Sequence, residues 1–184
     1  MSIAIEHVTA QESPVAPPRA ASNVLTADDV WREVRNASFA VLSYVTPSGE
    51  PRSSGVMYTM AGDRMYVVVA VDSWKARHIE ADGHVAVTVP VRRGGVLSLL
   101  FPIPPATISF HGRAIVRPAG ALEGESLPKQ LTSMVPPARR ELCRVIEIQP
   151  EAKFVTYGLG VSLAEMRDPA VARARMPIDS NHSM

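Results

Sequence analysis

The stretch of sequence that decides the fold runs from residue 39 to residue 91: FAVLSYVTPSGEPRSSGVMYTMAGDRMYVVVAVDSWKARHIEADGHVAVTVPV. It opens with three strand-like runs that are rich in valine, tyrosine and other apolar residues, at 39–46, 52–60 and 64–71. Short turns with proline or glycine join them. Strands joined in this way are antiparallel neighbours, because a parallel crossover needs about a dozen residues or more. A helix over 73–82 and a fourth strand over 84–91 complete the stretch.

The chain on both sides of this stretch continues the pattern of short elements. Residues 26–35 are expected to form a helix, with Thr26 as its N-cap and a buried stripe of Val30, Trp31 and Val34. Further strands are expected at 106–116, at 143–148 and at 153–157, and Gly112 indicates a bulge or bend in the first of them. The segment at 121–140 is expected to be irregularly helical. A short helix is expected to start at residue 162. Six or seven antiparallel strands with few helices predict a mainly β protein whose sheet curls into a closed or half-closed barrel.

One domain accounts for most of the 184 residues. Residues 1–23 contain three prolines and lack the features of a signal peptide, so a flexible N-terminal arm is expected there. Residues 24–168 form the barrel domain. Residues 169–184 are expected to be a poorly ordered C-terminal tail.

Composition narrows the classes of function. A net charge of +1 gives no broad basic field, which argues against nucleic acid as a partner. No apolar run approaches the ~20 residues that span a bilayer, so no membrane partner is expected. The single cysteine, Cys143, cannot form an internal disulfide, and a reducing cytoplasm is the simplest location.

The start of the helix at residue 73 is the strongest functional signal. Ser73, Lys75 and Arg77 bring a hydroxyl and two cations to a helix N-terminus, where backbone amides lack partners and the helix dipole favours an anion. This pattern indicates a phosphate-binding corner. The alternative is that Ser73 is an ordinary N-cap and that both cations are solvated. His78 and His84 are interpreted as solvated or structural, because no metal-ligand spacing surrounds them.

Several short motifs occur in the order found in a known family. Gly49-Glu50-Pro51 precedes the second strand, Ser73-Trp74-Lys75 opens the helix, and the strand at 108–116 contains a G-x-A motif. In these features residues 26–160 resemble the pyridoxamine-phosphate-oxidase-like, flavin-binding split barrels. The resemblance implies an antiparallel split β-barrel of six to seven strands, of the flavin-reductase or oxidase type. It also implies a homodimer that holds its cofactor at the subunit interface.

The resemblance further implies the cofactor and its contacts. Members of the family bind FMN, a deazaflavin analogue or, less often, heme. The cofactor-binding residues in this chain would be Arg52, Ser53 and Ser54 at the entrance to the second strand, the backbone of Val69 and Ala70, and Ser73, Lys75 and Arg77. Arg52 could equally be a surface residue, and the serines could serve the turn. The oxidase proper has arginine and lysine where this chain has Ser54 and Thr59, which favours a reductase.

The function that follows is a flavin- or deazaflavin-dependent oxidoreductase that transfers a hydride to or from a small, fairly apolar molecule. The cofactor carries this chemistry, and the accompanying proton would come from solvent, Tyr58 or His111. The alternative is a protein on the same barrel that binds a cofactor, such as heme, or an apolar ligand without turnover. The apolar loop at 94–105 would either wall the substrate cavity or lie in the dimer interface.

Overall fold

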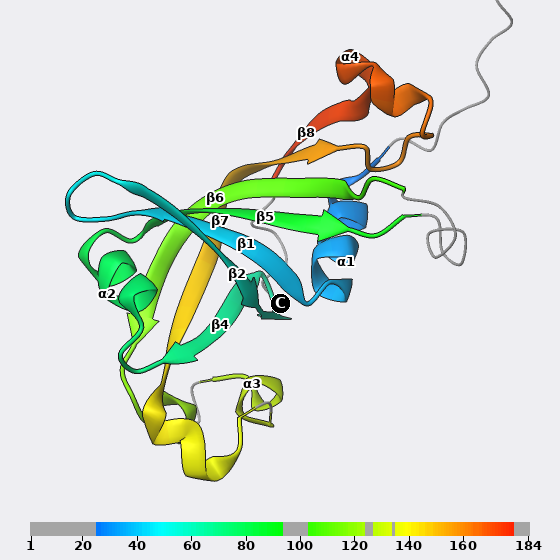
Figure 1. Cartoon of the computed structure of the whole chain (residues 1–184). Helices are drawn as coiled ribbons and strands as arrows, with labels where there is room; N and C mark the ends of the chain where they lie inside the picture. Colours follow the sequence, from blue (N-terminus) through cyan, green and yellow to red (C-terminus); the bar gives the residue numbers. More distant parts are fainter. Residues whose placement is uncertain (1–24, 94–102, 124–126, 134, 179–184) are drawn as a thin grey trace, which may run out of the picture.

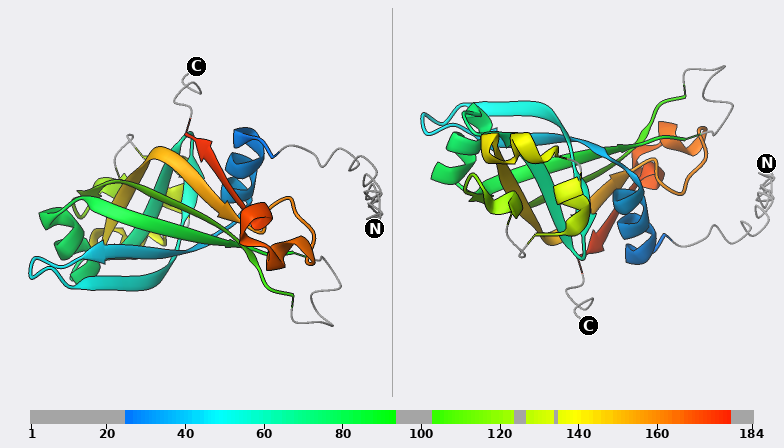
Figure 2. Two further views of the ribbon diagram at one scale, coloured as in Figure 1. Left: turned by 90° about the horizontal axis from the view of Figure 1, so that it is seen from above. Right: turned by 90° about the horizontal axis from the view of Figure 1, so that it is seen from below.

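The computed structural model describes residues 25–93, 103–123, 127–133 and 135–178. Within them, seven strands form one antiparallel sheet in the order β2-β1-β5-β6-β7-β4-β3, and an eighth strand, β8, pairs with β7. Figure 1 shows the sheet curling around a core, and Figure 2 shows α1 and α2 at opposite ends of the resulting barrel. The predicted mainly β, antiparallel barrel is therefore confirmed.

Short helices separate the strands. The strands are β1 (Phe39–Val45), β2 (Pro51–Met57), β3 (Thr59–Ala61), β4 (Arg64–Ala70), β5 (His84–Val91), β6 (Ala106–Arg117), β7 (Cys143–Tyr157) and β8 (Arg173–Pro177). The α-helices are α1 (Ala27–Asn36), α2 (Trp74–Ala81), α3 (Lys129–Ser133) and α4 (Pro169–Ala172). Short 3-10 helices occur at Ala121–Glu123, Pro137–Leu142 and Glu165–Arg167, so the described part of 121–140 is irregularly helical as predicted.

Helix α1 begins where the sequence predicts it. The Thr26 hydroxyl accepts a hydrogen bond from the Asp29 amide at 3.2 Å, and the Asp29 carboxylate accepts one from the Thr26 amide at 3.0 Å. These reciprocal bonds form a capping box. The predicted stripe of Val30, Trp31 and Val34 is buried, so α1 packs its apolar face against the barrel.

The second predicted strand, 52–60, is in fact two strands. The chain turns at Tyr58, so that β2 pairs with β1 while β3 pairs with β4, at opposite ends of the sheet order. Tyr58 forms two hydrogen bonds at the C-terminal end of α1. Its hydroxyl donates to the Val34 carbonyl in the last turn at 2.6 Å, and its amide donates to the Ser38 carbonyl, just after the helix, at 3.0 Å. This corner connects the two edges of the sheet, and it replaces the expected continuous three-stranded meander.

The last two predicted strands form a single long strand, β7. Its pairing with β6 shifts register between Ser109 and His111, and Ala152 of β7 adopts a φ of 61° at this place. Such a bulge lets a strand bend and continue. The predicted bend at Gly112 lies next to the shift. A Cβ atom on Gly112 would lie 2.3 Å from the Gln149 carbonyl oxygen, so a glycine is required there by the close approach of β7.

The expectation of a poorly ordered tail from residue 169 is wrong for residues 169–177, which form α4 and β8. Asp168 caps α4 by accepting a hydrogen bond from the Ala170 amide at 2.9 Å. Strand β8 pairs with the end of β7, and Met176 is buried in the main core. Burial of Met176 and an available strand edge explain why this segment is ordered. The predicted arm at 1–23 lies outside the described residues.

Two apolar clusters stabilise the described part of the fold. The larger fills the barrel, where the Phe154 ring meets Trp31 and Phe110 edge to face, with centroids 4.9 and 5.6 Å apart. The smaller lies on the outer face of β4 and β7 and consists of Tyr66, Leu122, Leu127, Leu131, Val135 and Val145. It attaches α3 to the side of the barrel, away from the ends that α1 and α2 occupy (Figure 1).

Candidate functional site

The barrel is open along two strand edges. In the described part of the chain, β2 pairs only with β1. Strand β4 pairs with β3 only from Arg64 to Tyr66, so its second half, 67–70, has a strand partner on the β7 side alone. Alternate backbone amides and carbonyls of both edges therefore lack a partner in the sheet. Five of the predicted cofactor-binding residues lie on these edges: Arg52, Ser53 and Ser54 on β2, and Val69 and Ala70 on β4.

Helix α2 follows β4 directly, and its N-terminus is incompletely capped. Ser73 occupies the N-cap position, but its hydroxyl makes no capping hydrogen bond. The first turn has no acidic residue and contains Lys75, whose charge opposes the helix dipole. In α1, by contrast, a capping box is present and two aspartates occupy the first turn. Ser73 therefore occupies the N-cap position without the side-chain hydrogen bond of an ordinary cap, and the first amides of α2 have no intrahelical partner.

The opposite side of α2 is fixed to the barrel, which sets the position of this corner. Ala76 and Ile79 are buried against the sheet. Glu80 forms an ion pair with Arg144 of β7 at 2.5 Å, and this hydrogen bond lowers the pKa of the Glu80 carboxyl. These contacts hold the start of α2 beside the end of β4.

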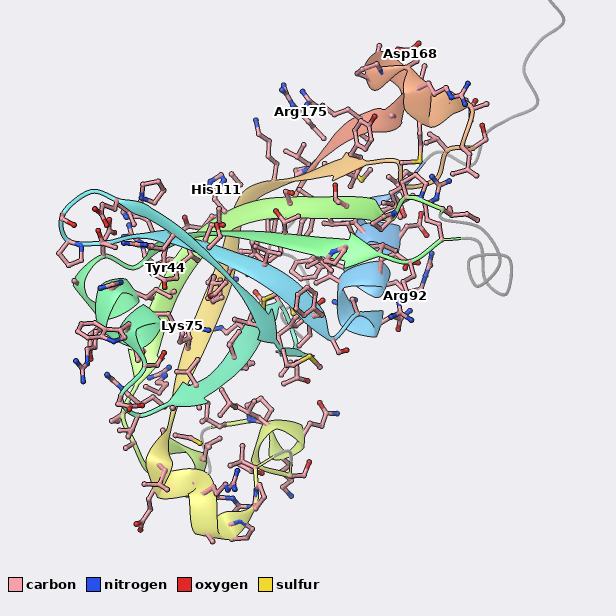
Figure 3. The ribbon with its side chains drawn as sticks, viewed as in Figure 1. Tyr44, Lys75, Arg92, His111, Asp168 and Arg175 are labelled. Carbon is pink, nitrogen blue, oxygen red and sulfur yellow. The ribbon has the colours of Figure 1, made fainter. Side chains whose placement is uncertain are left out.

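The two predicted cations of α2 behave differently. Lys75 is half-buried and has no ion-pair partner among the described residues; Figure 3 shows it at the same end of the barrel as Tyr44. Arg77 is exposed, and its guanidinium carbon lies 5.0 Å from the centroid of the Trp74 ring. Lys75 is therefore the cation that is available to an anion at the start of α2, whereas the charge of Arg77 lies over Trp74.

The polar side chains of β2 also differ in their surroundings. Ser53 faces outward, and its hydroxyl shares a hydrogen bond with Ser43 at 2.8 Å. Ser54 faces inward, and its Oγ is buried without a hydrogen-bond partner in the described residues. Such an unpaired hydroxyl costs about 1–3 kcal/mol, which a bound ligand could recover. Arg52 forms an exposed ion pair with Glu50 at 2.6 Å, an interaction worth only about 0–1 kcal/mol.

His78 adds a second buried polar atom without a described partner to this site, although the sequence predicts a solvated or structural histidine. Its Nδ1 is buried and has no hydrogen-bond partner within the described ranges. Its ring centroid lies 5.8 Å from that of Tyr44 and 6.1 Å from that of Trp74. His78 follows Lys75 by three residues, so the two share a face of α2. That spacing was visible in the sequence, but the contact with Tyr44 depends on how α2 packs on β1.

Solved structures share this arrangement of strands and helices. A heme binding protein from Mycobacterium smegmatis has a TM-score of 0.56 and 16% identity, over 79% of this chain and 55% of that one. An FAD-binding protein from Mesorhizobium loti has a TM-score of 0.53 and 16% identity, over 69% and 91%. A candidate pyridoxamine 5'-phosphate oxidase from Listeria innocua has a TM-score of 0.50 and 17% identity, over 67% and 92%. The chain has the pyridoxamine-phosphate-oxidase-like split-barrel fold.

Identities this low establish the fold of the split barrel and nothing about its ligand, and the names of the similar proteins include both FAD and heme. No protein-family model matches the sequence, and a search of curated proteins finds no match. The contacts of this chain's own residues must therefore carry any argument about its function.

Two of the cavities in the described part of the split barrel bear on these predictions. The larger, of 690 Å³, lies where α1 ends, and its lining includes Arg92, just before the apolar loop, and Pro105 at the end of that loop. Residues 94–102 of that loop lie outside the described residues. Figure 3 shows Arg92 at the opposite end of the barrel from Lys75, so this cavity is remote from the α2 corner. The smaller cavity, of 240 Å³, lies between β2, β3, β4 and α3, beside the open edges.

The predicted proton donors are not equivalent. The Tyr58 hydroxyl is occupied by its hydrogen bond to the Val34 carbonyl, and burial raises the pKa of this phenol. His111 is exposed on the outer face of β6. Within the described residues, no cluster of three or more potential metal ligands occurs, and no helix has the length and apolar character needed to cross a membrane.

Proposed function

We propose that this chain binds FMN or a deazaflavin analogue at the start of α2 and along the open edges of β2 and β4. We propose that it is an oxidoreductase that transfers a hydride to or from a small, fairly apolar molecule. The observation that carries the proposal is the incompletely capped start of α2, where Ser73 and Lys75 adjoin amides without intrahelical partners. A phosphate dianion would accept hydrogen bonds from these donors and balance the charge of Lys75. The similarity in fold to an FAD-binding protein supports this choice of ligand.

The residues of the site would act along the length of such a cofactor. Ser73, Lys75 and the first amides of α2 would bind the phosphate. Ser54 and His78, whose buried polar atoms lack partners in the described residues, would hydrogen-bond the polar groups between phosphate and ring. The backbone near Val69 and Ala70 would hold the ring. A bound flavin or deazaflavin supplies the hydride chemistry, while the barrel orients it and excludes water.

A homodimer is part of the proposal, with a second copy of the chain covering the outer face of β1 and β2. Phe39, Val45 and Met57 are 45%, 44% and 56% exposed on these strands, and apolar side chains gathered on one face are typical of an interface. Light scattering on the eluting peak of a size-exclusion column tests this part. A monomer at micromolar concentration, with or without cofactor, would contradict it.

The cofactor is tested by titrating the purified full chain with FMN and, separately, with a deazaflavin analogue, while following fluorescence. Tight binding of one of them at one site per chain is expected. If neither binds with a dissociation constant below about a millimolar, equivalent to ~4 kcal/mol, the proposal fails. Reduction of the bound cofactor, followed by reoxidation with an added acceptor, separates an enzyme from a protein that only binds.

Heme binding is the second candidate function, and the observation that favours it is the similarity in fold to the heme binding protein from Mycobacterium smegmatis, with a TM-score of 0.56. His111, which is exposed on β6, would be a candidate axial ligand. Added hemin should then give an absorption band in the blue that is shifted and sharpened relative to that of free hemin, and His111→Ala should reverse this change. A spectrum identical to that of free hemin would exclude this function.

A further inference from the structure

The cleft of 240 Å³ beside the open edges has a defined position relative to the proposed cofactor site. Its lining residues are Met57, Tyr58, Thr59, Tyr66, Val68, Leu131 and Val135. Val68 precedes Ala70 by two residues and projects to the same face of β4, about 7 Å along the strand. The cleft therefore adjoins the part of β4 that is proposed to hold the flavin ring, and it lies at the opposite end of that edge from the start of α2.

The lining of the cleft is suited to an apolar molecule with few polar groups. Its side chains are aliphatic or aromatic, apart from three hydroxyls. The Tyr58 hydroxyl is already bound to the Val34 carbonyl at 2.6 Å, which leaves Thr59 and Tyr66. Burial, with a smaller contribution from the Glu147 charge, raises the pKa of Tyr66, so this phenol remains a hydrogen-bond donor. The cleft can thus satisfy one or two polar atoms of a ligand and buries the remainder against carbon.

The size of the cleft limits the ligand further. Its 240 Å³ exceeds the roughly 150 Å³ of an engineered apolar cavity that binds benzene, and it is smaller than the roughly 300–1,000 Å³ of pockets for drug-sized ligands. The base of the cleft is well packed, because Leu131 and Val135 are buried in the smaller apolar cluster. Met57 lies at the edge of the cleft, and its flexible side chain can adapt to different shapes.

We infer that this cleft binds the apolar part of the substrate, and that the substrate is a molecule of one or two fused rings with one or two polar atoms. The inference rests on the proposed function and defines the substrate class of that function. The larger cavity near Arg92 is not part of the proposed substrate site, because it lies at the far end of the barrel from Lys75 (Figure 3).

Indole and naphthalene are suitable probes, because both have two fused rings and only indole adds an N–H donor. The full chain, labelled with carbon-13 in its methionine, valine and leucine methyl groups, is titrated with each probe in the absence of cofactor. Saturable shifts are expected at the Met57, Val68 and Leu131 methyls and not at Val91, which lines the larger cavity. Val68→Phe fills the cleft and should weaken indole binding at least about tenfold. Val155→Phe, at a half-buried valine of β7 outside the cleft, is the matched control and should bind as the wild type does.

Shifts at Val91 without shifts at Met57 and Leu131 would overturn the inference, and so would unchanged indole affinity in Val68→Phe. Should that variant fail to fold, the wild-type methyl shifts decide alone. The FMN titration reports separately on the α2 corner. Cofactor binding without probe binding at the cleft overturns this inference and leaves the proposed function intact. Probe binding without cofactor binding keeps the cleft as a site for apolar ligands and removes the redox reaction.

Discussion

Replacing Lys75 by alanine separates the contribution of this lysine to binding from its contribution to folding. Lys75 is half-buried and has no ion-pair partner in the described residues. Its truncation therefore removes few stabilising contacts from the native state. The change also deletes a positive charge from the first turn of α2, where the helix dipole disfavours it by about 0.3–1 kcal/mol. We therefore expect the free energy of unfolding to stay the same or rise slightly. A hydrogen bond between a charged amine and a phosphate contributes about 1.5–3 kcal/mol, so the Kd for the cofactor should increase about 10- to 150-fold.

The assay pairs a fluorescence titration of the cofactor with urea unfolding of the same preparations. Raising the salt concentration should weaken wild-type binding more than binding by the variant, because the variant lacks one of the charges that salt screens. Lys153→Ala, at an exposed lysine of β7, is the matched control and should change neither quantity. An unchanged Kd in Lys75→Ala would remove Lys75 from the site. A parallel loss of stability and binding would show that Lys75 serves the fold instead.

Three further changes test other parts of the structure. His78→Leu should keep or raise the free energy of unfolding, because Nδ1 has no described partner to lose, yet it should weaken cofactor binding; a clear loss of stability in urea would refute this. Glu147 is buried between Arg64 and Arg117: burial raises its pKa, but the hydrogen bonds from both arginines outweigh this effect, and the net pKa is lowered. The carboxylate therefore stabilises the fold above its unfolded pKa of about 4.5, and this contribution is lost as the pH falls through the folded value. Glu147→Gln should lose about 1–3 kcal/mol near neutral pH and should lose less than wild type on acidification, as measured by urea unfolding across pH. Deletion of residues 169–184 removes β8 and the buried Met176 and should lower stability by about 2 kcal/mol or more; an unchanged urea midpoint would mean that β8 contributes nothing.

The strands could be predicted from the sequence where local chemistry marks both of their ends. The run at 84–91 alternates between buried valines and other residues, and proline and glycine mark the turn before β2. The break at Tyr58 could not be predicted, because Met57, Tyr58 and Thr59 all suit a strand. Its cause is a pair of hydrogen bonds to the Ser38 and Val34 carbonyls, which exist only once α1 has packed. Tertiary contacts, not local preference, decide where this strand ends.

The sequence does not predict strand β8, because this strand also depends on tertiary contacts. The five residues Arg173–Pro177 alternate in burial, with Met176 inside, but a strand this short with a terminal proline has little preference of its own. It forms because β7 extends far enough to offer a second edge to Arg175 and its neighbours. That part of β7, 153–157, is predicted as a strand, but the sequence does not show which segment pairs with its second edge.

The candidate site was partly visible in the sequence. Ser73-Trp74-Lys75 marks the start of α2, and its ordered position after three strand-like runs led to the split-barrel prediction. The sequence could not show whether the Ser73 hydroxyl caps the helix, because the residue type favours a cap but does not fix the hydrogen bond of its side chain. The place of His78 beside Tyr44 depends on the packing of α2 against β1. Cofactor binding by the eight predicted residues stays a prediction.

The open edges and the exposed apolar face are connected by the Tyr58 corner. The corner is tied to α1 and carries the chain from the edge of β2 to the edge of β4, so the opening between them is built into the fold. Unpaired strand edges attract further strands, and exposed side chains such as Phe39 and Met57 favour association. A cofactor that occupies the edges and a second copy that covers the face would lie side by side. If the second copy also contacts the bound cofactor, the two binding events are thermodynamically linked, and each changes the affinity for the other by the same factor. The proposed cofactor site and the proposed dimer are therefore parts of one hypothesis about this opening.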